Sequence, residues 1–375
     1  MKIVFVSNYL NHHQLPFCIQ LAKENDIDFT FVATMQIPKF RLALGYEDLN
    51  NKYPFVVRAY ESDESKAFGI KLATEADVTI IGTNDIVFIE KRLRDNKLTF
   101  KMSERLFKES GLNLLIKLIP KTIKYRKLYK KFKEKNFYLL SQGDYSKRDY
   151  QKIGLFKNKV LRWGYFPKPY YLQPSQRAET IQILWCGRVI DWKRPMIVFS
   201  ISRFLEKEKN NFEIKIVGTG DLCNKIQRKI KRKNIKNIEL IGPLNGDGVH
   251  KMMSESNIFV ISSNRREGWG AVLNEAMSHG CICFSNKAVG ASTYLINNGV
   301  NGFIYRGKKD LHKKLKQYID FDSKTRINIE LKAKETISKI WNGENAAKNL
   351  IHQIKFYFEN HYFDSSISGP GSIYK

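Results

Sequence analysis

The chain is predicted to fold as two consecutive α/β domains, and three features of the sequence predict this. Its 375 residues suit two domains of ordinary size. Short β-branched and aromatic runs alternate with longer amphipathic stretches, the pattern of open parallel sheets covered by helices. Near the middle, residues 163–169 and 173–175 hold three prolines in eight positions, which cannot continue a helix or a central strand. We therefore expect an interdomain linker there.

The same pattern occurs on both sides of this linker. Helices over residues 13–25 and 85–95 lie between strands in the first half, and similar helices lie between strands in the second. A helix at about 345–358 is long enough to pack back across the junction, and residues 364–375 resemble a flexible tail. The expected strands are residues 3–6, 29–33, 78–82, 98–102 and 137–141, then 181–185, 212–217, 238–241, 258–262 and 281–285.

The strongest candidate site follows the predicted strand 258–262 and opens a helix. Gly268 and Gly270 permit a tight turn and close approach of a ligand to the backbone, and the first N–H groups of the helix suit a phosphate. Glu267 and Glu275, eight residues apart, can accept paired hydrogen bonds from vicinal hydroxyls at two points of one extended ligand. Exposed glutamates that merely cap a helix are the alternative, but the two glycines and the strand-to-helix context favour a binding site.

Two cations follow the first predicted strand of the second domain. Arg188 comes directly after Gly187, and Lys193 lies five residues further on. Together they can clamp a diphosphate, the arginine in bidentate fashion and the lysine as a point charge. The alternative is that they are ordinary surface cations, because the chain has 64 basic residues. Their position favours a binding site, since they follow a strand in the domain that also contains Glu267 and Glu275.

Two further turns end strands of the same domain. Gly218 and Gly220 follow the strand 212–217, and Pro243 with Leu244 follows the strand 238–241. A Gly-x-Gly turn alone is weak evidence, equally consistent with an ordinary turn and with part of a nucleotide pocket. Pro243 and Leu244 could flank a flat base.

Together these motifs resemble the GT-B glycosyltransferases, specifically family 4 of the retaining sugar-nucleotide enzymes, of the bacterial surface-polysaccharide type. Glu267 and Glu275 match that family's Glu-x7-Glu motif, and Gly187-Arg188 with Lys193 matches its donor-phosphate motif. Residues 217–220 match its glycine turn, and the resemblance covers roughly residues 155–350. It implies the GT-B fold, two Rossmann-like domains whose parallel sheets face a central cleft.

The resemblance also implies an activity. A sugar would pass, with retention of configuration, from a nucleoside-diphosphate sugar, with UDP the expected nucleotide, to a glycan or lipid-linked acceptor. Residues 1–165 would bind the acceptor, residues 166–345 the donor, and residues 346–363 would return to the first domain. Such enzymes usually need no metal and no other cofactor.

Roles for single residues follow from the same resemblance. Arg188 and Lys193 would neutralise the leaving diphosphate, Glu275 would bind the ribose, and Glu267 would bind the donor sugar. Backbone amides near sugar and phosphate would come from Gly268, Trp269, Gly270, Ala271 and Val272.

The N-terminal half matches the family less closely. Members often carry a glycine-rich loop after the first strand and a histidine after a middle strand. Residues 101–105 occupy the second place, where Ser103 and Arg105 are the candidate substitutes for the histidine, and this departure leaves the sugar's identity open. The first place holds polar residues that could contact acceptor or sugar, or could equally cap the next helix: Asn11, His12, His13 and Gln14.

The net charge of +27 is concentrated in one part of the chain. Residues 101–250 hold 34 basic against 13 acidic side chains, whereas residues 1–100 hold 12 against 13. Within residues 101–135, twelve Lys and Arg against three Glu are interleaved with apolar and aromatic residues. That mixture is typical of a surface resting on anionic lipid, although half of the apolar residues could face the core.

The remaining features bear on location and on rival functions. Five scattered cysteines and no signal-like or membrane-spanning apolar run predict a cytoplasmic protein, soluble or peripherally attached. With the basic stretch 101–135, the family resemblance implies a place on the inner face of the cell membrane, in capsule or lipopolysaccharide synthesis. A sugar-nucleotide epimerase or a phosphorylase on the same fold is the nearest alternative. A nucleic-acid-binding protein is disfavoured because no RRM or zinc-finger motif accompanies the charge.

Overall fold

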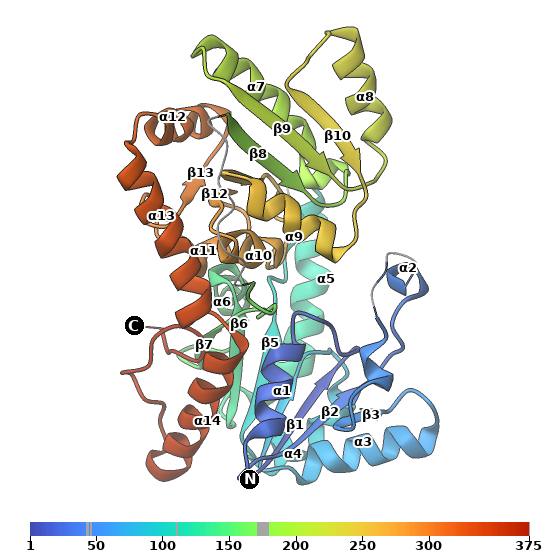
Figure 1. Ribbon diagram of the computed structural model, residues 1–375. Coiled ribbons are helices and arrows are strands. Elements are labelled where there is room, and N and C mark those ends of the chain that lie inside the picture. Colours follow the sequence, from blue (N-terminus) through green and yellow to red (C-terminus); the bar gives the residue numbers. More distant parts are fainter. Residues whose placement is uncertain (43–44, 46, 110–111, 171–179, 375) are drawn as a thin grey trace. The chain divides into compact units, whose positions relative to one another are not determined.

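The computed structural model describes residues 1–42, 45, 47–109, 112–170 and 180–374. They form two compact units, one of Met1–Lys168 with Ile340–Lys375 and one of Pro169–Lys339 (Figure 1). The chain thus crosses between units twice, after Lys168 and after Lys339. Of the expected linker, residues 173–175 lie outside the described residues.

The N-terminal unit is built on a seven-stranded sheet in the order β3-β2-β1-β4-β5-β6-β7. All its strand pairs are parallel, which confirms the predicted class of sheet. The five predicted strands are present, and two short ones, β3 and β7, were not predicted. The strands are β1 (Lys2–Ser7), β2 (Asp28–Ala33), β3 (Val56–Arg58), β4 (Val78–Ile81), β5 (Thr99–Ser103), β6 (Phe137–Gln142) and β7 (Val160–Trp163).

Helices cover this sheet. The predicted helix 85–95 is split into a 3-10 turn, η2 (Ile86–Phe88), and the short α4, because Ile89 leaves the helical region at φ −130°. Other 3-10 turns are η1 (Leu49–Asn51) and η3 (Lys130–Phe132). The helices are α1 (Leu15–Lys23), α2 (Lys39–Leu42), α3 (Asp63–Glu75), α4 (Glu90–Arg94), α5 (Leu112–Tyr129), α6 (Asp144–Lys152) and α14 (Gly343–Asn360).

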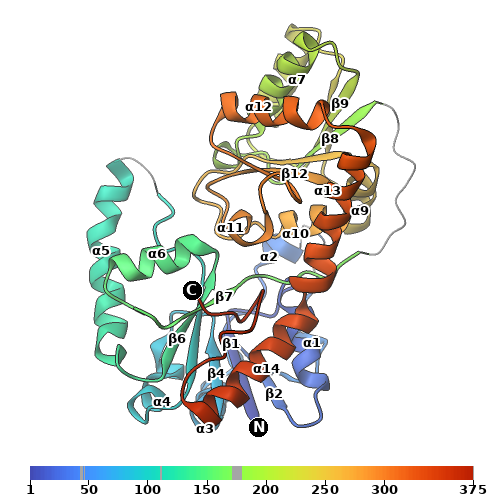
Figure 2. The ribbon, with the colours of Figure 1, turned by 90° about the vertical axis from the view of Figure 1, so that its left-hand side faces the viewer.

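The C-terminal segment belongs to the N-terminal unit. Helix α14 lies alongside α1 in both views (Figure 2), and the Tyr357 hydroxyl donates to Asn136 Oδ1 at 2.7 Å. The expectation of a flexible tail is wrong, because Ile373 forms an antiparallel bridge with Leu161, and Arg162 N–H donates to the Ser372 carbonyl at 2.8 Å. Strand β7 is the edge of the sheet, and the tail satisfies backbone groups that would otherwise stay unpaired.

The C-terminal unit contains a six-stranded parallel sheet in the order β10-β9-β8-β11-β12-β13. Its five predicted strands are confirmed, and only the three-residue β13 was not predicted. They are β8 (Ile181–Cys186), β9 (Phe212–Val217), β10 (Ile238–Gly242), β11 (Ile258–Ile261), β12 (Ile282–Asn286) and β13 (Phe303–Tyr305).

Short and long helices connect these strands. Two 3-10 turns, η4 (Asp191–Lys193) and η5 (Pro195–Ile197), lead from β8 into the first full helix. A π-helical turn, Thr336–Ile340, ends the unit. The helices are α7 (Val198–Lys207), α8 (Cys223–Arg232), α9 (Gly246–Glu255), α10 (Val272–Ser278), α11 (Ser292–Leu295), α12 (Lys308–Ile319) and α13 (Ser323–Glu335).

The strand order of the C-terminal sheet reverses between β8 and β11, which lie side by side although distant in sequence. In open α/β sheets, ligands bind outside the carboxyl ends of the strands at such a reversal. The loops that follow β8 and β11 are therefore the first place to seek a site.

Candidate active site

The loops after β8 and β11 are joined by an ion pair. Lys193, at the end of η4, donates from Nζ to Glu267 Oε2, and the Ser263 hydroxyl donates to the same oxygen at 2.7 Å. Both side chains are largely buried, the lysine 15% and the glutamate 12% exposed. An ammonium has three N–H donors, so Lys193 can hold Glu267 and still donate to a ligand.

Hydrogen bonds hold the two loops in register. Ser262, directly after β11, places its hydroxyl 2.6 Å from the Lys193 carbonyl and accepts from Trp185 Nε1 at 2.8 Å. Asn264 N–H donates to the Trp192 carbonyl at 2.9 Å. The position of Lys193 is thus fixed by the strand ends themselves. Sequence reasoning did not single out these serines; the available signal was their place directly after a buried strand.

Trp192 lies between the two predicted cations. The Arg188 guanidinium carbon is 5.4 Å and Lys193 Nζ 4.8 Å from the centre of its ring, both within cation–π range. Arg188 itself is exposed. The arrangement keeps two positive charges on one loop, one exposed at the surface and one paired with Glu267.

The glycine turn after β9 is required by close packing against the loop after β8. Gly218 has φ +132°, and a Cβ there would lie 2.0 Å from the Gly187 carbonyl oxygen. A Cβ on Gly220 would lie 2.6 Å from the carbonyl oxygen of Val189. These glycines therefore shape the Arg188 loop, which accounts for them without direct contact to a ligand. Pro243 and Leu244, at the end of β10, are exposed.

The turn from β11 into α10 also depends on a close backbone approach. A Cβ on Gly290 would lie 2.0 Å from the Gly268 carbonyl oxygen, and Gly270 has φ +92°. The Trp269 side chain is fully buried and its Nε1 donates to Asn274 Oδ1 at 2.9 Å. The Trp269 side chain is therefore out of reach of a ligand, and only its backbone amide could make a contact. If a ligand binds at the start of α10, Ala271 and Val272 would likewise contact it through their backbone amides.

Glu275 lies in the first turn of α10. Burial raises the pKa of its carboxyl group to about 7. Among the described residues of its unit, no side chain donates a hydrogen bond to it. The residue is half-buried, so its carboxyl group can still accept hydrogen bonds from a ligand.

Three aromatic side chains that sequence reasoning left unassigned gather next to Glu275. Tyr170 stacks on His250 with ring centroids 3.5 Å apart, and His250 Nδ1 lies 3.0 Å from His279 Nε2. His279 N–H donates to the Glu275 carbonyl at 3.2 Å, so the cluster lies one helical turn from that residue. From the sequence alone, only His279 could have been placed near Glu275, because the two residues are one helical turn apart.

Polar residues expected to meet an acceptor lie in the N-terminal unit. Asn11 Oδ1 accepts from His13 N–H at 3.0 Å and from Gln14 N–H at 3.2 Å, so Asn11 caps the turn before α1. Gln14 is buried, and the rings of His12 and His13 have centroids 3.7 Å apart. Burial, with His12 and Arg41 nearby, holds the pKa of His13 well below its usual value.

Ser103 and Arg105 are engaged within the same unit. The Tyr150 hydroxyl donates to Ser103 Oγ at 3.1 Å. Arg105 is buried, with its Nε 4.0 Å from Asp149 Oδ2 and its guanidinium carbon 4.5 Å from the Tyr145 ring centre.

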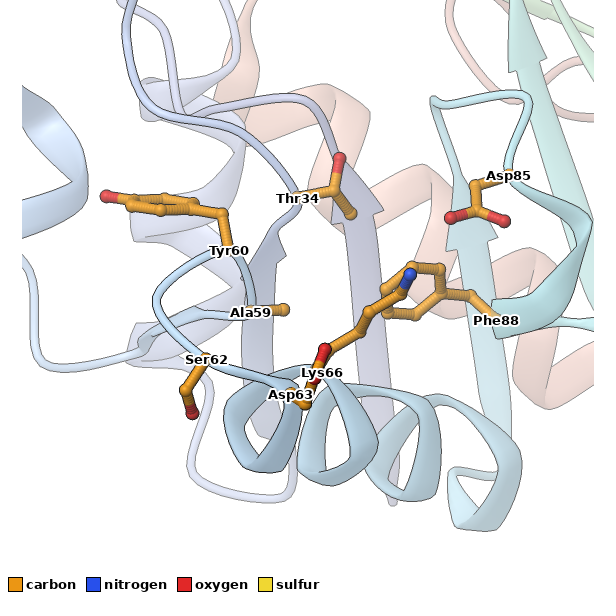
Figure 3. Close-up of a pocket in the computed structure, with 8 residues that line it drawn as sticks. All are labelled: Thr34, Ala59, Tyr60, Ser62, Asp63, Lys66, Asp85 and Phe88. Carbon is orange, nitrogen blue, oxygen red and sulfur yellow. The ribbon is translucent and has the colours of Figure 1, made fainter.

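A cavity of about 500 Å³ opens at the carboxyl ends of β2, β3 and β4. Figure 3 shows the Lys66 side chain rising from α3 on the side where Thr34 and Asp85 lie. The volume is within the range of small-molecule sites. No residue of this cavity was predicted, because its members come from three separate stretches of the chain, residue 34, residues 59–66 and residues 85–88, and form no motif. It is lined by Thr34, Ala59, Tyr60, Ser62, Asp63, Lys66, Asp85 and Phe88.

Comparisons with known proteins find similarity to glycosyltransferases. Residues 173–336, nearly all of the C-terminal unit, match the family described as "Glycosyl transferases group 1". The "Uncharacterized glycosyltransferase MJ1178" of Methanocaldococcus jannaschii is 30% identical over 112 residues. That stretch is 29% of this chain and 31% of the relative, so the chain matches less than a third of the relative's length.

Solved structures show the class of fold over nearly the whole chain. A glycosyltransferase from Rickettsia africae has a TM-score of 0.67 at 15% identity, covering 96% of this chain and 99% of its own. HepE from Anabaena, in complex with UDP and glucose, has 0.64 at 14%, covering 95% and 99%. The "lipopolysaccharide outer core galactosyltransferase WaaB" has 0.64 at 15%, covering 96% and 100%. The two parallel-sheet units therefore have the GT-B fold, as predicted.

Proposed function

We propose that the protein is a retaining glycosyltransferase of the family 4 type that takes its sugar from a nucleoside-diphosphate sugar, most simply a UDP-sugar. The observation that carries the proposal is the Lys193–Glu267 ion pair, which lies where the strand order reverses between β8 and β11. Arg188 lies on the same loop as Lys193, and Glu275 lies in the first turn of α10, the helix that follows Glu267. The glycosyltransferase group 1 match over residues 173–336 covers all four residues. HepE, a fold relative, holds UDP and glucose in its solved structure.

The proposed chemistry uses these residues as follows. The bond between the anomeric carbon and the diphosphate oxygen breaks, and both bonding electrons leave with the diphosphate. Arg188 and Lys193 stabilise the charge that develops there, an effect that is large in a partly buried site. The acceptor hydroxyl attacks the same face of the sugar and gives its proton to the leaving phosphate oxygen, so configuration is retained.

The two glutamates position the donor. Glu267 accepts hydrogen bonds from hydroxyls of the sugar while Lys193 holds its carboxylate, and Glu275 accepts from the ribose hydroxyls. Because a carboxylate can accept from two vicinal hydroxyls at once, each glutamate fixes orientation as well as affinity. No divalent metal takes part in this scheme, so chelation with EDTA is expected to leave the rate unchanged.

The acceptor is proposed to bind the N-terminal unit. Its cavity combines the carboxylates of Asp63 and Asp85, the ammonium of Lys66 and the ring of Tyr60, groups that suit the hydroxyls and apolar faces of a glycan. We assign the acceptor as a glycan or lipid-linked sugar of a bacterial surface polysaccharide, capsule or lipopolysaccharide. The enzyme would then work in the cytoplasm, peripheral on the inner face of the cell membrane through residues 101–135.

A donor screen tests this function. Wild-type protein is offered common nucleoside-diphosphate sugars with and without lipid-linked acceptors, and the released nucleoside diphosphate and the anomeric configuration of the product are measured. We expect turnover of one donor with retention, and a fall in kcat/KM of about 100-fold in Glu267→Gln, which loses the paired charge. Turnover of no donor, or an unaltered Glu267→Gln enzyme, would contradict the proposal.

A further inference from the structure

Helix α5 has two apolar faces, and only one of them is covered. On the inner face, Leu118, Tyr125 and Leu128 pack against the core of the N-terminal unit, and Tyr129 is buried. On the outer face, four large aliphatic side chains are among the most exposed of the described residues. They are Leu112 (73% exposed), Ile116 (61%), Ile119 (65%) and Ile123 (61%).

These four residues form a continuous stripe. Their spacings of four, three and four residues place them on one side of a helix with 3.6 residues per turn. In Figure 2, α5 (teal) runs along the margin of the N-terminal unit. Single exposed apolar residues are ordinary on protein surfaces, but a contiguous row of them marks a surface that another apolar phase covers.

The charges around the stripe have one sign. Helix α5 contains no acidic residue, and its five basic residues are Lys117, Lys121, Lys124, Arg126 and Lys127. Lys117 pairs with Glu109 at 3.1 Å, and Lys121 donates to the Leu106 carbonyl at 2.9 Å. Among the described residues, Lys124, Arg126 and Lys127 are exposed and have no acidic partner, and Arg126 and Lys127 follow Ile123 by three and four residues, which places them next to the stripe.

We propose that the outer face of α5 docks on an anionic lipid leaflet, with Leu112, Ile116, Ile119 and Ile123 inserted among the acyl chains. The cations beside the stripe lie at the level of the negative headgroups. A second copy of the chain suits this face poorly, because two such helices would bring like charges together. The inference rests on the proposed function for its partner, a membrane that carries the acceptor.

The structure also shows that only part of the basic stretch 101–135 can contact a membrane. Lys101 and Arg105 are buried, and Lys131 pairs with Glu90 at 2.6 Å. The apolar stripe should therefore contribute more to binding than the number of lysines in the stretch. This distinction can be measured, because salt screens charge–charge attraction between exposed groups and leaves apolar burial in place.

The test is co-sedimentation with vesicles of phosphatidylcholine and phosphatidylglycerol, compared with phosphatidylcholine alone. The stripe variant is Ile116→Gln/Ile119→Gln/Ile123→Gln. The matched control is Ile327→Gln/Leu331→Gln, which makes the same chemical change at i and i+4 on α13, where the two residues are 55% and 54% exposed. We expect the stripe variant to bind anionic vesicles about tenfold more weakly or worse, and the control to bind like wild type.

Equal binding by the stripe variant and wild type would overturn the proposal, as would a dimer in solution that the stripe substitutions dissociate. An Ile119→Trp protein gives an independent measurement: its added fluorescence should shift to the blue on anionic vesicles and be quenched by lipids brominated on the acyl chains. Absence of both signals would equally overturn the proposal. Donor turnover is measured in parallel, and the α5 variants should keep it. Failure of the lipid-docking proposal then appears as unchanged vesicle binding, whereas failure of the transferase proposal appears as absence of donor turnover in the wild type.

Discussion

Glu275 is the residue whose protonation should control donor binding. Its pKa is raised to about 7 by burial, so the group becomes protonated as the pH falls through 7 and loses the carboxylate that we propose accepts two ribose hydroxyls. We expect the KM for the donor to rise as the pH falls from 8 to 6.

Replacing Glu275 by Gln should raise this KM about tenfold at pH 8 and flatten its dependence on pH. The comparison is Glu255→Gln, at the half-buried last residue of α9. An unchanged pH profile in Glu275→Gln would show that another group titrates.

Lys101 lies fully buried on β5, with its Nζ 2.6 Å from the Thr83 carbonyl. Burial lowers its pKa from 10.5 to about 7. Between these values the unfolded chain binds more protons than the folded one, so stability should rise with pH from 7 to 10.5.

A Lys101→Met variant should be roughly 2–4 kcal/mol more stable than wild type at pH 7, because it removes the cost of burying a charge. The difference should shrink at pH 9. Denaturant unfolding at both pH values measures it, with Lys91→Met on the exposed face of α4 as control. A less stable variant would show that the bond to Thr83 outweighs the burial cost.

Among secondary-structure elements, the turn that ends β9 is the most constrained part of the site. A Gly218→Ala change places a Cβ 2.0 Å from the Gly187 carbonyl oxygen at a positive φ, so the Arg188 loop must move. We expect a loss of roughly 2–4 kcal/mol in the stability of the C-terminal unit and much weaker binding of UDP.

The matched change is Gly246→Ala at the start of α9, where a Cβ would meet nothing within 4 Å. Unfolding curves of both variants provide the comparison. Equal stability of Gly218→Ala and Gly246→Ala would refute the idea that the glycine turn is there to shape the loop.

The elements also show how far sequence patterns reach. All ten predicted strands are present, since continuous apolar runs report burial on both faces of a parallel sheet. The missed strands β3, β7 and β13 have three or four residues, too few for a pattern. The ordering of residues 370–374 was not predictable, because it depends on an unpaired sheet edge some two hundred residues away in the chain.

For the whole molecule, sequence motifs indicate the proposed donor site more clearly than the proposed acceptor site. Arg188, Lys193, Glu267 and Glu275 stand in recognisable local motifs, and the reversal of strand order brings their loops together. The direct Lys193–Glu267 pair could not be foreseen, because the two residues are 74 positions apart. The N-terminal cavity collects single residues from several loops and has no motif. In the described residues, moreover, no helix is long and apolar enough to span a membrane.

The central claim is that the loop after β8 binds the diphosphate of the donor, and a calorimetric titration with UDP tests it most directly. Wild-type protein should bind one UDP, and Lys193→Ala should bind it at least about tenfold more weakly. Lys225→Ala, which removes an exposed lysine of α8 in the same unit, should bind like wild type. No saturable binding of UDP by the wild type, or equal affinities in all three proteins, would contradict the account.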